Sequence, residues 1–151
     1  RGAPVFLSLI VHHENGVAVS AQAAGLLPIS QHAMRFWGQV GYHDYEGLTL
    51  GAAEGARLVA SLGSHPALFL RNHGTLTVGR TVAEAYVLMA TLIKACEIQL
   101  GAQAGSAVVQ PPAAVAERTS LQLDDGGAVE GVLEWPSLRR KLDRIDPSYQ
   151  D

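Results

Sequence analysis

Three histidines lie where they could bind a metal ion. His12 and His13 follow an apolar run at residues 4–11, and His73 lies in an Asn-His-Gly turn between two further apolar, β-prone runs. Runs of this composition bounded by Asn and Gly predict strands, so the histidines would lie at strand ends, where side chains reach a cleft. Three neutral imidazoles around an open position make up a common catalytic zinc site. We therefore take His12, His73 and His13 as candidate ligands of Zn²⁺.

The spacing leaves the third ligand open. Two ligands from one strand normally lie at positions i and i+2, because only alternate residues share a face. The residue two positions before His12 is Ile10, which cannot bind a metal. His12 and His13 are adjacent and would point to opposite faces, although a bulge at the strand end could bring them together. On spacing alone, strand-end histidines that bind no metal are an equally good interpretation.

A second polar stretch, Tyr-His-Asp-Tyr-Glu, occupies residues 42–46. It could line a cleft, but taken by itself a solvated loop is the favoured interpretation. The sequence has neither a Gly-x-Gly-x-x-Gly pattern nor a Walker-type phosphate loop, so the usual nucleotide-binding motifs are not indicated.

The bulk composition indicates a folded domain and excludes some classes of partner. The 151 residues are 48% hydrophobic and 17% charged, with a formal net charge of −3. We expect neither nucleic acid nor a membrane as a partner, because the chain is not basic and its apolar runs are shorter than the roughly 18 residues of a span. The single cysteine, Cys96, allows no internal disulfide and fits a reducing, cytoplasmic location. Its helical surroundings predict a core residue rather than a nucleophile.

Helical and strand patterns alternate along the chain. A hairpin-like strand–turn–strand around His73 favours a mixed, mainly antiparallel sheet flanked by helices over a doubly wound parallel one. Asn15 is the expected N-cap of the first helix, and Thr81 and Glu84 form a capping box before the longest one. The residues predict strands at 4–11, from 40, at 67–71 and at 75–78, and helices at 16–24, 30–37, 52–62, 82–103, 112–123 and 134–146.

Several stretches together resemble the class II aldolase/adducin family over roughly residues 3–103. They are GVAVSA, GLLPISQ, YHDYEG, LRNHG and ACEIQ, at residues 16–21, 25–31, 42–47, 70–74 and 95–99. The tail at residues 142–149 is similar to the C-terminal extension of bacterial members. The resemblance implies that residues 1–105 are the C-terminal portion of a class II aldolase/adducin-like domain and that residues 106–151 are a helical extension. The chain enters an apolar strand almost directly after Arg1, so we expect a preceding part of the domain that this chain does not include.

The resemblance also implies a fold and a chemistry. The fold is an α/β/α sandwich around a mainly antiparallel sheet. Members of the family usually form a homo-oligomer, namely a homotetramer. In active members a His-x-His pair and a later histidine bind zinc, which acts as a Lewis acid when a carbon–carbon bond of a small hydroxy-carbonyl substrate is cleaved. His73 matches the later ligand and His12 the second histidine of the pair, while Ile10 takes the place of the first. A shifted alignment would keep His13 as a candidate.

His32 is the candidate catalytic residue. Sugar-phosphate aldolases of the family have a catalytic tyrosine four positions after a proline, and here the residue four positions after Pro28 is His32. An imidazole could transfer protons near neutral pH. Two functions follow from the resemblance. One is a zinc-dependent aldehyde-lyase (retro-aldol) activity that is weak or lost in this chain, because a ligand is replaced. The other is a non-catalytic, adducin-like assembly module.

Overall fold

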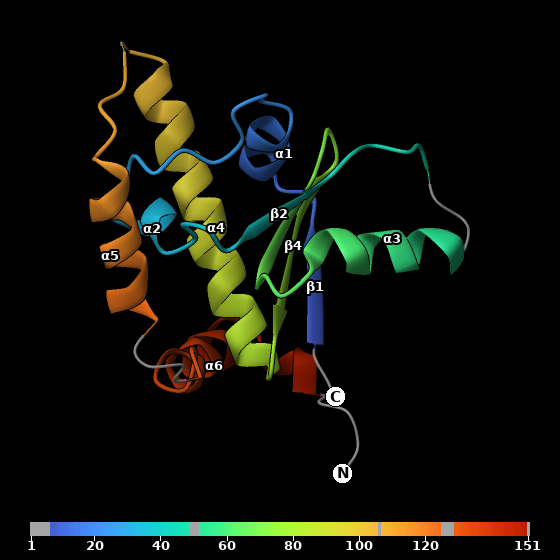
Figure 1. Cartoon of the computed structure of the whole chain (residues 1–151). Helices are drawn as coiled ribbons and strands as arrows, with labels where there is room; N and C mark the ends of the chain where they lie inside the picture. Colours follow the sequence, from blue (N-terminus) through green and yellow to red (C-terminus); the bar gives the residue numbers. More distant parts are fainter. Residues whose placement is uncertain (1–6, 49–51, 106, 125–128, 151) are drawn as a thin grey trace.

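The computed structural model describes residues 7–48, 52–105, 107–124 and 129–150 (Figure 1). Within these ranges the strands form one mixed sheet in the order β1-β4-β3-β2. Strands β1 and β3 both run antiparallel to β4, and β2 runs parallel to β3. The expected mixed, mainly antiparallel sheet is therefore confirmed. The strands are β1 (Leu7–Val11), β2 (Val40–His43), β3 (Ala67–Leu70) and β4 (Gly74–Gly79).

Helices cover both faces of this sheet, which confirms the α/β/α arrangement. Figure 1 shows α3 on one side of the sheet and α1 and α4 on the other. Helix α5 packs against α2, and α6 packs against α4. The helices are α1 (Glu14–Ser20), α2 (Gln31–Met34), α3 (Ala52–Leu62), α4 (Val82–Gln103), α5 (Ala113–Leu123) and α6 (Glu134–Ile145), followed by the short 3-10 helix η2 (Pro147–Gln150).

Strand β3 is buried on both faces because its alternate residues pack into two different cores. Phe69 packs on one face in a cluster with Leu92 of α4. Leu68 packs on the other face, against Leu58 of α3. Alternation along a strand sends successive side chains to opposite faces, so an apolar run without polar breaks is what a central strand of a three-layer domain requires.

Helix α4 is the central helix of the domain. Its N-cap Thr81 accepts a hydrogen bond from the amide of Glu84, as the capping pattern predicted. By length and composition alone α4 could cross a membrane. The apolar runs of the sequence were too short to predict such a helix, because polar residues interrupt them. Leu88, Leu92 and Cys96 of α4 are buried in the cluster that includes β3, and this packing accounts for the apolar composition. Cys96 is thus a core residue, as expected.

Strand β1 and helix α1 differ from the sequence-based expectation. The run at 4–11 is apolar on both faces, which predicts a strand covered on both sides. In the structure Leu7 and Ile10 are exposed, and residues 4–6 lie outside the described residues. The reason is that β1 is an edge strand, and α3 packs on β2 and β3 instead of on it. Helix α1 begins at Glu14, with His13 rather than Asn15 as its N-cap, and ends at Ser20 rather than at 24.

Candidate metal site and the adjoining cavity

The end of β1 and the β3–β4 turn bring two of the candidate ligands together. The Nε2 atoms of His12 and His73 lie 2.7 Å apart. The two rings are stacked, with centroids 4.6 Å apart and an interplanar angle of 26°. Both imidazoles therefore present the same nitrogen to one point at the surface of the domain. Without an ion, one Nε2 must carry a proton and donate it to the other.

Local backbone geometry explains how His73 reaches His12. Asn72 has a φ of +58°, which is the left-handed conformation that asparagine tolerates in turns. The amide of His73 donates to the carbonyl of Leu70 at 3.0 Å and closes the turn. A Cβ atom at Gly74 would lie 2.6 Å from the carbonyl oxygen of Val11. Glycine therefore permits the close approach of β1 that places His12 against the turn.

The third candidate ligand points elsewhere. The Nδ1 atom of His13 accepts a hydrogen bond from the amide of Asn15 at 3.2 Å and caps helix α1. The structure thus places His13 in a capping role, whereas His12, its neighbour, faces His73. Capping by histidine is not the usual choice of Ser, Thr, Asp or Asn, which is why the sequence pointed to Asn15 instead.

Ile10 occupies the position at which the resemblance to class II aldolases predicts a histidine. It is two residues before His12, pairs with Leu76 of β4, and is 48% exposed. Together with His73 it lines a cavity of about 200 Å³. Nitrogen ligands of a tetrahedral zinc ion at 2.0–2.1 Å are roughly 3.3 Å apart, so the His12–His73 pair would need to open only slightly to hold an ion. The chain therefore has imidazoles at two of the three positions that the resemblance predicts, and an apolar side chain at the third.

His32 lies outside this cavity. It is exposed in α2 and lines a separate surface depression with Thr91 and Lys94 of α4 and Glu134 of α6. Among the described residues, those lining the His73 cavity do not include His32. Within one chain, His32 and the His12–His73 pair therefore do not belong to one site.

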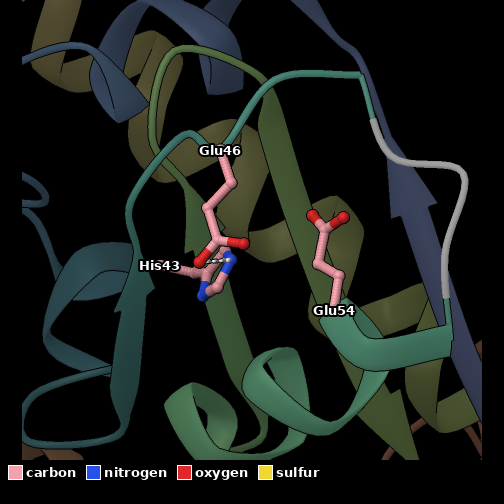
Figure 2. Close-up of side chains that lie close together, drawn as sticks. All are labelled: His43, Glu46 and Glu54. Carbon is pink, nitrogen blue, oxygen red and sulfur yellow. Dashed lines mark ion pairs between the residues drawn. The ribbon is translucent and has the colours of Figure 1, made fainter.

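The polar stretch at residues 42–46 lines the cavity with His43, Asp44, Tyr45 and Glu46, although a solvated loop was the favoured interpretation. His43 is buried, 7% exposed, instead of lying in a solvated loop. Its Nδ1 atom lies 2.9 Å from the hydroxyl of Ser61 in α3, and its Nε2 atom lies 3.9 Å from a carboxylate oxygen of Glu46. Glu54, in the first turn of α3, faces the same space (Figure 2). The alternation in β2 was a usable signal, because it places His43 on the same face as the buried Gly41.

Arg57 favours the ionised form of Glu46. Arg57 of α3 binds both of its carboxylate oxygens, and this hydrogen-bonded ion pair holds the pKa of Glu46 below its ordinary value. The nearby His43 contributes a smaller lowering of the same pKa. Glu46, Glu54 and His43 line the same cavity as Ile10 and His73, so this acidic cluster and one imidazole of the His12–His73 pair share a cavity.

Arg71 ties the strand ends around this cavity to the helical layer. Its guanidinium donates to the carbonyl oxygens of Ser20 and Gln22, and it lies over the ring of Tyr42, 4.4 Å from the centroid. Its amide donates to the carbonyl of His43 at 2.8 Å. These contacts connect the β3–β4 turn, the end of β2 and the segment after α1. The contacts of Arg71 therefore fix the positions of the backbone segments that carry the side chains at the cavity.

Comparison with known proteins places this arrangement in a family. A model described as the Class II Aldolase and Adducin N-terminal domain matches residues 9–100. An aldolase class 2 protein of Caulobacter vibrioides, so named from its family, is 44% identical to this chain over 143 residues. The match covers 93% of this chain and 56% of that protein. Alpha-adducin of Rattus norvegicus is 44% identical over 91 residues, which are 60% of this chain and 12% of that protein.

A solved structure agrees with this assignment. The crystal structure of an aldolase II superfamily protein from Pseudomonas syringae matches with a TM-score of 0.88 and 42% identity, over 95% of this chain and 59% of that chain. The present chain thus spans just over half the length of these two bacterial relatives. The chain belongs to the class II aldolase and adducin family.

Proposed function

We propose that this chain carries a weakened form of a metal-dependent retro-aldol site, with His12 and His73 as its two ligands. The observation that carries the proposal is the convergence of their Nε2 atoms at 2.7 Å. Two imidazole nitrogens directed at one point suit Zn²⁺ and related divalent ions. A bound ion would supply Lewis-acid stabilisation of the negative charge that develops on a substrate oxygen during carbon–carbon cleavage.

The residues around the pair define what could bind there. The cavity of about 200 Å³ beside His73 suits a small hydroxy-carbonyl compound. The ring of Tyr45 meets His73 edge to face, with centroids 6.3 Å apart, and helps to fix the orientation of the imidazole. Ile10 presents an aliphatic side chain in place of a third ligand, so we propose a lower metal affinity and a lower rate than in members with three histidines.

The roles of the remaining candidates stay proposals. His32 could transfer a proton only from another copy of the chain, because it does not line the cavity of its own chain. His13 remains a ligand candidate only if it leaves its capping contact with the amide of Asn15. The homo-oligomeric state, the tetramer, the cytoplasmic location and the division at residue 105 remain predictions.

The test is aldehyde release from a panel of hydroxy ketones and ketose phosphates, with and without Zn²⁺. We expect slow, zinc-dependent release that is lost in His73→Ala. The matched control is His65→Ala, because His65 lies outside the residues that line this cavity. Release that needs no zinc, or equal rates in the His73→Ala and His65→Ala variants, would refute the proposed site.

An assembly role is the alternative, and the 44% identity to alpha-adducin favours it. Helix α6 and the segment before it expose Leu133, Leu142 and Ile145, and such side chains are suited to contact between protein surfaces. Light scattering of the purified chain at increasing concentration tests this role. Association without zinc binding would favour assembly, whereas a monomer at high concentration would exclude self-association as the function.

A further inference from the structure

We propose that His43, Glu46 and Glu54 form a second divalent-cation site, distinct from the His12–His73 pair. One ligand atom from each of the three residues lies within 4.8 Å of the other two. The ligands come from the end of β2, from the loop that follows it and from the first turn of α3, and Figure 2 shows them around one space. One imidazole and two carboxylates make a mixed nitrogen and oxygen set, which suits Zn²⁺ or Mn²⁺.

The buried imidazole gives an independent reason to expect an ion. His43 is 7% exposed, and among the described residues its Nε2 atom has no hydrogen-bond partner. A buried polar atom without a partner is unfavourable and calls for an explanation. Figure 2 shows the His43 ring beside the Glu46 carboxylate, and the ion pair drawn there joins Nε2 to Glu46 at 3.9 Å. An ion between these atoms would satisfy the orphaned nitrogen.

A second contact holds the ring in the orientation that a ligand needs. The Nδ1 atom of His43 lies 2.9 Å from the hydroxyl of Ser61. Metal-binding histidines commonly use their other ring nitrogen in such a hydrogen bond, which fixes both the tautomer and the ring orientation. If Nδ1 carries the proton and donates it to Ser61, Nε2 keeps its lone pair for the ion.

Arg57 supplies the cation that a metal would have to displace. It binds both oxygens of Glu46 and keeps that carboxylate ionised. The side chain of Arg57 is 51% exposed, so it has room to turn toward solvent when an ion binds. Arginine and metal therefore compete for Glu46. The competition predicts the direction of one effect: removal of the guanidinium should raise the affinity for the metal.

The experiment is a Zn²⁺ titration of the whole chain in a His12→Ala/His73→Ala background, followed by competition with a chromophoric chelator. This background removes the first pair, so failure of the function proposed above does not affect the result. We expect about one equivalent of zinc to bind. Glu54→Gln should weaken binding roughly tenfold or more, because even indirect supports of a metal site contribute about 10–100-fold. Arg57→Gln should tighten it about threefold or more.

The matched control is Glu97→Gln, which removes an exposed carboxylate from α4 that pairs with Lys94. It should leave zinc affinity unchanged. Zinc-dependent stabilisation, measured as a shift in Tm for each variant, checks that the proteins are folded and reports binding a second time. The proposal is overturned if the background variant binds no zinc, if Glu54→Gln and Glu97→Gln have equal effects, or if Arg57→Gln does not tighten binding.

Discussion

Replacing Ile10 by histidine should complete the three-imidazole site. Ile10 lies two residues before His12, near the end of β1, and it lines the cavity beside His73. Because Ile10 is 48% exposed, its loss should cost only about 1 kcal/mol of folding stability. Four-ligand structural zinc sites are worth about 10–16 kcal/mol, or about 3 kcal/mol per ligand. Ile10→His should therefore raise zinc affinity roughly 100-fold.

The assay is chelator competition with Zn²⁺, carried out on the natural chain, on Ile10→His and on Ile10→His/His73→Ala. The double variant should lose the gain, because its new imidazole has only His12 as a partner. Ser8→His is the matched control. It adds a histidine to the same face of the same strand, about 6.6 Å farther from His12. The geometry assigned to the site would be refuted if Ile10→His did not raise the zinc affinity, or if Ser8→His raised it equally.

Three further predictions concern the scaffold. Gln99 is fully buried and accepts a hydrogen bond from the amide of Leu27. Gln99→Leu should therefore lower the free energy of unfolding in urea by about 2–4 kcal/mol, and a change below about 0.5 kcal/mol would contradict this. Burial raises the pKa of Cys96 to about 12 from 9.0. The native thiol should consequently resist a disulfide reagent at pH 8, and stability should fall from pH 9 upward as the unfolded thiol ionises. Rapid native labelling would contradict this burial. A Cβ atom at Gly74 would lie 2.6 Å from the carbonyl oxygen at the end of β1, whereas one at Gly101 meets nothing within 4 Å. Gly74→Ala should thus cost about 1–3 kcal/mol and weaken zinc binding, while Gly101→Ala, at an exposed position near the end of α4, should stabilise by about 0.5–1 kcal/mol. Equal effects of the two glycine variants would contradict the close approach.

Local signals in the sequence were enough to predict much of the framework. The Asn-His-Gly turn needs only a left-handed Asn72 between two apolar strands. The turn residues and the two apolar runs are adjacent in the sequence, so the turn could be predicted locally. The N-cap Thr81 follows from a side chain that hydrogen-bonds within three residues, and the same holds for Ser30, which caps α2 at the start of the helix expected from residue 30. Placing His12 and His73 at strand ends made them candidates for one site, but their meeting also required β1 and β4 to be neighbours, which only the structure shows.

Features that depend on tertiary contacts could not be predicted in this way. The burial of His43 results from Ser61 in α3, which lies 18 positions later in the chain. The nearness of Glu54 to His43 depends on how α3 packs against β2. Periodicity also does not reveal which strand is at the edge of a sheet, so Ile10 was expected to be buried although about half of it is exposed.

The central claim is that His12 and His73 hold one divalent ion between their Nε2 atoms. Nitrogen-15 NMR of the histidine side chains during addition of Zn²⁺ tests it most directly, with signals assigned from the His12→Ala and His73→Ala variants. We predict that the Nε2 signals of both histidines shift together, that either substitution abolishes the shift of the other, and that His65 does not respond. Unchanged His12 and His73 signals at saturating zinc would contradict the account.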